Sequence, residues 1–296
     1  MSTKINEAHD FLNSLAMDPP KLPYEPTLLP KLFKNLSDDS RMSMGELAGL
    51  VERSQGLAAK VLQIANSACY GLQGGVTSLT RAVQVLGLLE LRSLVLFFSV
   101  SGAIPRASLP KAFPTHDLWE HQIRTALLGR QIALQIQDNL PKGAEAPDAD
   151  SVYTAALLHD LGKVVLAARK PEVWAAVTEI SNAQNCDFAT AEDIYWGIDH
   201  GTIAAMLLKA WDLPELLTQM ISWHHHPELA SEYKLEVNIL AAANRLAVSG
   251  LAEGGLIPPQ VAELLPQYAP LLQQNHAAIQ ETLKGDRAGL MAGFAA

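Results

Sequence analysis

The stretch that decides the fold runs from Ala155 to Lys170 and reads AALLHDLGKVVLAARK. It opens with a short apolar run that ends at the neighbouring pair His159–Asp160, and Gly162 and Lys163 follow directly. A neighbouring His–Asp pair can bind a divalent metal, or it can cap and stabilise a helix. The stretch therefore raises two questions: whether the pair binds a metal or caps a helix, and whether the site is catalytic.

The composition around this stretch favours helices packed on helices. Hydrophobic residues make up 49% of the 296 residues, so a sizeable core can form, while aromatic residues make up only 6%. Leu and Ala, which are strong helix formers, dominate. No convincing alternation of period two occurs anywhere in the chain. We therefore predict an all-α fold, a two-part helical bundle with an N-terminal half and a second half that contains the His–Asp pair.

Charge and sequence character also limit the classes of function. The net charge of −9 argues against a general nucleic-acid-binding surface. The N-terminus lacks the apolar segment of a signal peptide, and the most apolar stretch, 93–104, is too short to cross a bilayer. The two cysteines indicate neither a disulfide framework nor a zinc finger. We expect a cytoplasmic protein with no membrane segment; the sequence leaves its oligomeric state open.

Proline-rich and polar segments divide the chain. We expect an N-terminal extension at 1–21, a first helical half at 22–110, a second at 111–250 and a helical tail at 251–296, with a proline-rich boundary at 105–117. Gly87 marks a junction between two helices of the first half. Helical patterns in the second half cover 118–137, 152–168, 171–184, 199–211, 214–223 and 235–249.

Six of the nine histidines fall on or beside these predicted helices. They are His121, His159, His200, His224, His225 and His226. Neutral imidazole and carboxylate groups suit zinc, iron, manganese or nickel, and a helical bundle supplies such ligands from several facing helices. A lone histidine on a helix is more often a hydrogen-bonded structural residue. Four separate helices that each offer histidine are a stronger signal.

Helix geometry restricts how neighbouring residues can share an ion. Adjacent side chains on an α-helix diverge by about 100°. His159 and Asp160 can therefore share one ion only if it sits near a helix end, or one ligand must bridge two ions. The same holds for His224 and His225.

At this point the pattern resembles a known family. The order His121, His159–Asp160, His200, His224–His225 resembles the HD superfamily of metal-dependent phosphohydrolases. The surrounding segments resemble the HDOD domain, a branch of signal-transduction modules. The segments that carry this second resemblance are ELAGLVERSQGLAAKVLQIANSACYG, SLTRAVQVLGLLELRSLV, LWEHQIRTALLGRQIA and GIDHGTIAAMLLKAWDLPELLTQMISWHHHPELA. The match covers roughly residues 22–250.

The resemblance implies a set of site residues. His121, His159, Asp160, His200, His224 and His225 would hold one or two divalent transition-metal ions, although a degenerate site would hold none. In an active enzyme, Asp160 and Lys163 would take part in catalysis, with Lys163 steadying a phosphate. In an inactive site, Lys163 would simply form an ion pair with Asp160.

This sequence also departs from the active enzymes. They close the site with a late Asp, and here Asn244 stands at that place. An amide oxygen carries no charge, so it is a weak ligand for a transition metal. The GYP segment of cyclic-dinucleotide phosphodiesterases is missing as well. Asp199 or Glu228 could substitute, but the sequence does not show that either reaches the site.

Three hypotheses remain open from the sequence. The first is a regulatory module that acts through a protein partner in a signalling pathway, or through a ligand, with a degenerate metal site. The second is a metal-dependent phosphohydrolase acting on a phosphodiester or nucleotide. The third is a structural metal site that stiffens the bundle. We favour the first because of Asn244. The chain is either a stand-alone regulator or a fragment of a longer protein.

Overall fold

The structure is a computed structural model of the 296-residue chain, and it describes residues 2–21, 44–52, 55–66, 75–102 and 104–284. These residues form helices, and the described part contains no β-strand beyond one isolated bridge between Ala252 and Leu256. The predicted all-α fold is confirmed. Residues 22–43 of the predicted first half and 285–296 of the predicted tail lie outside the described residues.

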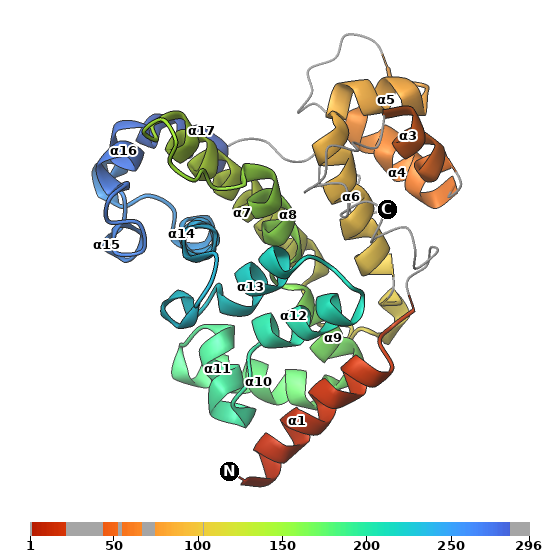
Figure 1. The fold of residues 1–296 in the computed structure, drawn as a ribbon. Helices are drawn as coiled ribbons and strands as arrows, with labels where there is room; N and C mark the ends of the chain where they lie inside the picture. Colours follow the sequence, from red (N-terminus) through yellow and green to blue (C-terminus); the bar gives the residue numbers. More distant parts are fainter. Residues whose placement is uncertain (1, 22–43, 53–54, 67–74, 103, 285–296) are drawn as a thin grey trace.

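The first half is a small bundle, drawn in orange and yellow in Figure 1. It consists of α3 (Met44–Glu52), α4 (Gln55–Ala65), α5 (Leu79–Leu86) and α6 (Leu88–Gly102), which pack against one another. The Ser78 hydroxyl accepts a hydrogen bond from the Arg81 backbone N–H and so caps α5. Gly87 separates α5 from α6 with a φ of 77°, a value that favours glycine, so the predicted junction is confirmed.

The second half surrounds the long helix α7 (Thr115–Asp138), which follows a 3₁₀ turn at Arg106–Ser108. Its other helices are α8 (Ala149–Leu158), α9 (Leu161–Arg169), α10 (Pro171–Gln184), α11 (Phe188–Trp196), α12 (His200–Ala210), α13 (Glu215–Trp223) and α14 (Lys234–Ser249). α7 packs against α8 and α14, and α12 packs against α9 and α13. No helix was predicted from the sequence at the position of α11.

The single helix predicted over 152–168 is wrong. α8 ends at Leu158 and α9 begins at Leu161, because Asp160 leaves helical geometry with a φ of −95° and a ψ of 7°. Gly162 lets the start of α9 approach α12 closely, since a Cβ atom at this position would collide with the carbonyl oxygen of His200. The chain therefore turns at the His–Asp pair, and that turn lies against α12.

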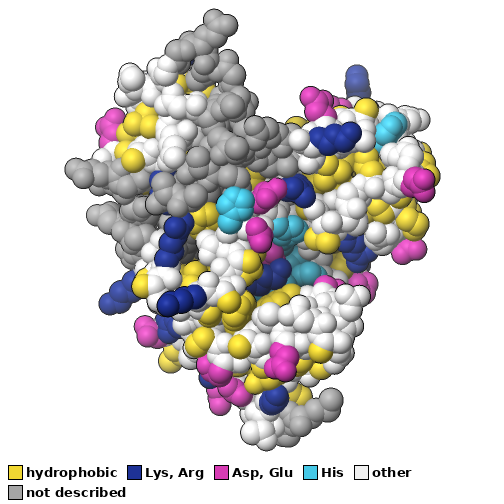
Figure 2. Space-filling view, turned by 180° about the vertical axis from the view of Figure 1, so that it is seen from behind, with side chains coloured by type: hydrophobic (Ala, Val, Ile, Leu, Met, Phe, Trp, Pro, Cys, Tyr) yellow, Lys and Arg dark blue, Asp and Glu magenta, His cyan; other side chains and the backbone are white. Residues whose placement is uncertain are grey.

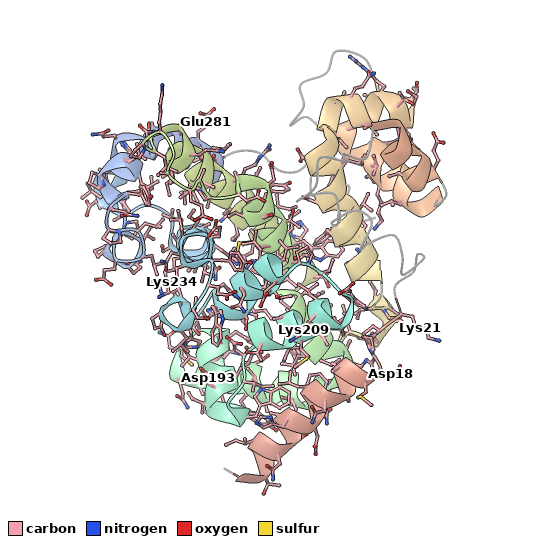
Figure 3. All side chains as sticks on the ribbon, viewed as in Figure 1. Asp18, Lys21, Asp193, Lys209, Lys234 and Glu281 are labelled. Carbon is pink, nitrogen blue, oxygen red and sulfur yellow. The ribbon has the colours of Figure 1, made fainter. Side chains whose placement is uncertain are left out.

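The N-terminal extension contains a helix, α1 (Ser2–Met17), that packs on α11 and α12 of the second half (Figure 1). The Phe11 ring stacks on Trp196 with centroids 5.7 Å apart. Beyond α1, the Trp211 indole N–H donates to the Pro20 carbonyl at 3.1 Å. Figure 3 shows Asp18 and Lys21 where the chain leaves this helix.

The tail also folds back on the second half. After a 3₁₀ turn at Glu253–Gly255 come α15 (Pro259–Ala262), α16 (Ala269–Gln274) and α17 (His276–Lys284). α16 and α17 pack on α7, and the Thr282 hydroxyl donates to the Gln131 side chain at 2.7 Å. In the described part of the chain, no helix combines the length and apolar character that a bilayer-spanning segment needs.

The two halves share a single hydrophobic core. α6 of the first half lies against α8 of the second. The Ser93 and Thr154 hydroxyls meet there at 2.6 Å, and the Tyr153 hydroxyl donates to Glu90 at 3.3 Å. The helix that leads into the His–Asp turn is thus held by both halves.

Candidate metal centre

The six side chains for which the sequence predicts a metal-binding role meet in one place in the second half. They come from the interior of α7, the α8–α9 turn, the first residue of α12 and the two residues directly after α13. We call this set the His/Asp cluster. It comprises His121, His159, Asp160, His200, His224 and His225.

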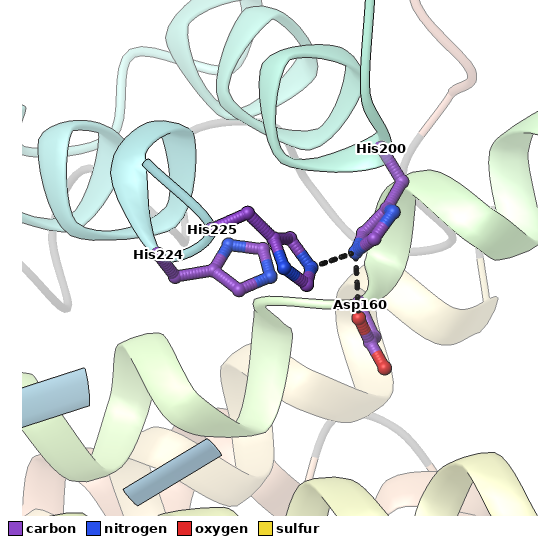
Figure 4. Close-up of side chains that lie close together, drawn as sticks. All are labelled: Asp160, His200, His224 and His225. Atoms are coloured by element: carbon purple, nitrogen blue, oxygen red, sulfur yellow. Dashed lines mark hydrogen bonds and ion pairs between the residues drawn. The ribbon is translucent and has the colours of Figure 1, made fainter. Parts of the chain in front are cut away.

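The donor atoms of the His/Asp cluster form two overlapping groups. In the first, shown in Figure 4, one ligand atom each from Asp160, His200, His224 and His225 lies within 4.8 Å of the others. In the second, the corresponding atoms of His121, His159 and Asp160 lie within the same distance. Asp160 belongs to both groups, so its two oxygens stand between them.

Helix ends make this convergence possible. His159 and Asp160 follow the last residue of α8, and His224 and His225 follow the last residue of α13. The divergence of neighbouring side chains inside a helix therefore does not keep either pair from sharing a site. Gly201 brings α12 and α13 together, because a Cβ atom there would lie 2.7 Å from the Ile221 carbonyl oxygen.

Two of the rings are oriented by the helices that precede them. His159 Nδ1 donates to the Ala156 carbonyl, and His224 Nδ1 donates to the Ile221 carbonyl, both at 2.7 Å. These carbonyls belong to last helical turns and have no partner further along the helix. A carbonyl can only accept a hydrogen bond, so each ring carries its proton on Nδ1. The lone pair on Nε2 then points into the cluster.

Burial keeps these rings neutral. It lowers the pKa of His224 to about 4, with the neighbouring His200 adding to the effect, and it lowers the pKa of His159 well below its ordinary value. The Nε2 atom of His224 is buried and has no hydrogen-bond partner among the described residues. A buried acceptor without a partner is costly unless a cation or water satisfies it.

Glu192, which the sequence analysis missed, stands directly behind His200. Its Oε2 accepts hydrogen bonds from His200 Nδ1 at 2.6 Å and from the His200 backbone N–H at 2.9 Å. Both side chains are fully buried. Burial raises the pKa of Glu192, although the charge and hydrogen bonds of His200 oppose this effect. A carboxylate behind a ligand histidine orients the ring and makes it a more basic ligand.

The other nitrogen of His200 faces Asp160 at 2.9 Å. Burial opposes a charge on His200, but Glu192 and Asp160 more than offset it and raise the pKa of the ring to about 9. A proton on Nε2 of His200 therefore holds the two groups together, and a metal ion bound here would take the place of that proton.

Asp160 is also paired with Lys163, as their spacing suggested. The Lys163 ammonium lies 2.8 Å from Oδ2 of Asp160. Burial disfavours the carboxylate of Asp160, but His159, Lys163 and His200 together hold its pKa well below the usual range. Asp160 therefore remains ionised, and it is the carboxylate that belongs to both donor groups.

Neither alternative carboxylate considered from the sequence reaches the cluster. Asp199 caps α12 and accepts from the Thr202 backbone N–H at 2.8 Å. Glu228, in the 3₁₀ turn at Pro227–Leu229, lies 3.6 Å from His226. His226 itself pairs outward with Asp193 and Glu228. Asn244 of α14 is nearly buried, and its side chain hydrogen-bonds to His121.

The cluster can be reached from outside. His224, His225, Asn244 and Arg245 line a cavity of about 300 Å³, which we call the α13–α14 cavity. Figure 2 shows histidine side chains in a hollow on one face of the molecule, beside basic and acidic side chains. His121 retains 21% of its side-chain exposure, whereas His159 and His200 retain none. A small ligand could therefore approach one side of a largely buried donor set.

Comparisons with known proteins identify the family of the chain. The family model for the HDOD domain matches residues 22–227. The chain belongs to the HDOD domain family. The resemblance drawn from the sequence is confirmed.

Solved structures share the fold of this HDOD chain. An HDOD domain protein of unknown function from Geobacter sulfurreducens has a TM-score of 0.67 at 24% identity, over 99% of this chain and 93% of that one. A candidate signal-transduction protein from Marinobacter aquaeolei VT8 scores 0.76 at 23% identity, over 98% and 66%. A candidate phosphohydrolase from Shewanella amazonensis SB2B scores 0.72 at 23% identity, over 96% and 97%.

A curated relative, an uncharacterised protein of Treponema pallidum (strain Nichols), is 28% identical over 228 residues. The match covers 77% of this HDOD chain but only 42% of the relative. The chain thus spans less than half of the length of that protein.

Proposed function

We propose that this HDOD chain is a regulatory module whose His/Asp cluster binds one divalent transition metal. In this proposal it acts by binding a signalling protein or ligand rather than by turnover. The observation that carries the metal proposal is the buried Nε2 atom of His224, which has no partner among the described residues. A ligand atom of the same side chain lies within 4.8 Å of those of Asp160, His200 and His225. An ion at this point would satisfy the Nε2 atom.

The chemistry of the donors fits such an ion. The first donor group offers three imidazoles and one carboxylate, a combination that suits zinc, iron, manganese or nickel. The Glu192 carboxylate behind His200 is the kind of support that ligand histidines receive in metal sites. A bound ion would supply a fixed positive charge that joins α9, α12 and α13.

Local charge favours one ion over two. Asp160 and Glu192 bring two negative charges, and Lys163 brings a positive one. One divalent ion would leave a net charge of one on the site, and a second would raise it to three. A large net charge in a buried site is unfavourable. Asn244 adds no charge where an aspartate would have helped.

A metal-dependent phosphohydrolase is the second candidate function. It is favoured by Asp160, which belongs to both donor groups and could bridge two ions, and by the α13–α14 cavity, which brings Arg245 beside His224 and His225. In this reading Lys163 and Arg245 would bind phosphate oxygens, and metal ions would supply Lewis-acid catalysis. The net charge of three that two divalent ions would leave on the buried site weighs against it.

A hydrolysis assay separates the two candidates. The chain is loaded with Mn²⁺, Fe²⁺ or Zn²⁺ and incubated with bis-p-nitrophenyl phosphate, nucleotides and cyclic dinucleotides, alongside Asp160→Asn. The proposal expects no metal-dependent rate above that of the variant. Hydrolysis that requires metal and disappears in Asp160→Asn would make the chain an enzyme.

A further inference from the structure

A second cavity of about 300 Å³ lies where the two halves of the chain meet. We call it the junction cavity. Its walls come from α4 and α6 of the first half, from the segment between α6 and α7, and from α7, α8 and α9 of the second half. Its lining residues include none of the His/Asp cluster. Its volume falls at the lower end of the range for small-molecule sites.

The inner wall of the junction cavity is apolar and rich in aromatic rings. Phe97 and Phe98 of α6 and Leu158 and Leu161 of the second half are all nearly fully buried. Trp119 lies against Phe97, with ring centroids 6.3 Å apart. Such a wall favours a flat or ring-bearing apolar group, because aromatic faces and edges pack well together.

The charged residues that line the cavity are both cations. The Lys60 ammonium lies 4.7 Å from the centroid of the Phe98 ring, and the Arg106 guanidinium lies 4.8 Å from that of Trp119. No Asp or Glu belongs to the described lining of the cavity. Burial, together with the charge of Arg106, lowers the pKa of Lys60. An anion placed between the two cations would relieve their repulsion.

A polar group is also available inside the cavity. Gln122 of α7 is only 3% exposed and contributes to the lining. The rim is formed by Pro105 and Arg106, which are exposed. The cavity thus combines an apolar interior, one inner amide and a cationic rim, in a chain whose net charge is −9. This is the pattern of a site that binds a mostly apolar molecule by its body and fixes its orientation by a few polar groups.

We propose that the junction cavity binds a small amphipathic organic anion. Its apolar, ring-bearing body would pack on Phe97, Phe98 and Trp119, and its carboxylate or phosphate head would lie between Lys60 and Arg106. The site stands on its own geometry and does not depend on metal in the His/Asp cluster. Because Leu158 and Leu161 immediately flank His159 and Asp160, an occupant also contacts the turn that carries two members of that cluster.

The test uses a matched set of probes. Binding of 1-naphthoate, 1-naphthyl phosphate and the neutral 1-naphthamide is measured by calorimetry on the full chain and on four variants. Lys60→Met and Arg106→Gln each remove one cation, Leu109→Trp fills the cavity from the loop before α7, and Lys209→Met removes an exposed lysine of α12 as the control. Circular dichroism establishes that every variant is folded.

We expect saturable binding of at least one anion with a Kd below about 1 mM, and 1-naphthamide at least about tenfold weaker. Lys60→Met and Arg106→Gln should each weaken anion binding about tenfold. Leu109→Trp should abolish it, and Lys209→Met should leave it unchanged. The relative affinity of the two anions identifies the preferred head group. Absence of saturable binding would overturn the proposal, as would equal binding of 1-naphthamide, or folded Lys60→Met and Arg106→Gln variants that bind like the parent.

Discussion

At the scale of single residues, Glu192 lies outside the donor set but determines the orientation of one of its histidine rings. Its Oε2 accepts from both the ring and the backbone of His200 and so fixes the ring at the first residue of α12. Removal of a carboxylate behind a ligand histidine costs metal affinity because the ring becomes a poorer and less oriented ligand.

We therefore expect Glu192→Gln to weaken metal binding by about 10- to 100-fold. The matched control is Asp193→Asn, because Asp193, labelled in Figure 3, is the next residue but is half-exposed and pairs with His226. Calorimetric titration of the ion-free chain with Mn²⁺ or Zn²⁺ measures both. Equal affinities for Glu192→Gln and the parent chain would show that the charge of Glu192 does not support metal binding.

Asn244 permits the opposite experiment. It is nearly buried beside His121, where it adds an amide but no charge. Asn244→Asp would bring a second carboxylate toward the donor set, so we expect metal affinity to rise about tenfold or more, or a second ion to bind. Asn139→Asp, at the exposed end of α7, is the control. Unchanged affinity and stoichiometry would mean that position 244 does not face the ion.

At the scale of elements, α1 stabilises the part of the second half that supports the site. Phe11 stacks on Trp196 of α11, the helix that carries Glu192, and α1 also packs on α12, which carries His200. We expect Phe11→Ala to cost about 3 kcal/mol of unfolding free energy, since a buried phenylalanine is lost. Met17→Ala, at a side chain that is 87% exposed, should cost little. Urea unfolding of both variants checks this, and equal stabilities would contradict the packing of α1.

A helix could be predicted from the sequence where the neighbouring residues mark its start and its end. The helix over 171–184 has the predicted bounds, and the proline-rich segment does precede α7. α11 was missed because it is short, although Asp187, which caps its start, and Gly197, with a φ of 79° at its end, were visible signals. One continuous helix was predicted over 152–168, across His159–Asp160, because nothing in the local sequence indicates that the backbone turns there.

The donor residues could be identified one by one, because each stands in a segment of the sequence that resembles the family. Their convergence could not be predicted, since it depends on close helix contacts at Gly162 and Gly201 that only the tertiary structure shows. The role of Glu192 could not be predicted from the sequence for the same reason. It lies in α11, where no helix was predicted, and it meets His200 at the start of α12.

At the scale of the whole molecule, the two halves share one core, and the His/Asp cluster draws on four parts of the second half. A metal ion that binds only this folded arrangement must stabilise it. At an ion concentration 100-fold above Kd, we expect a gain of about 2.7 kcal/mol in unfolding free energy. Chemical unfolding with and without the ion checks this, and the gain should disappear in His224→Ala. An equal gain in that variant would place the ion elsewhere.

The central claim is that the His/Asp cluster holds one metal ion, and metal content tests it most directly. Untagged protein from metal-supplemented medium is analysed by plasma mass spectrometry beside His159→Ala, His224→Ala and the control His226→Ala, whose histidine is half-exposed and points outward. We predict about one transition-metal ion per chain in the parent and in His226→Ala, and a clear loss in the other two variants. A parent chain without metal, or with metal that survives both cluster substitutions, would contradict the account.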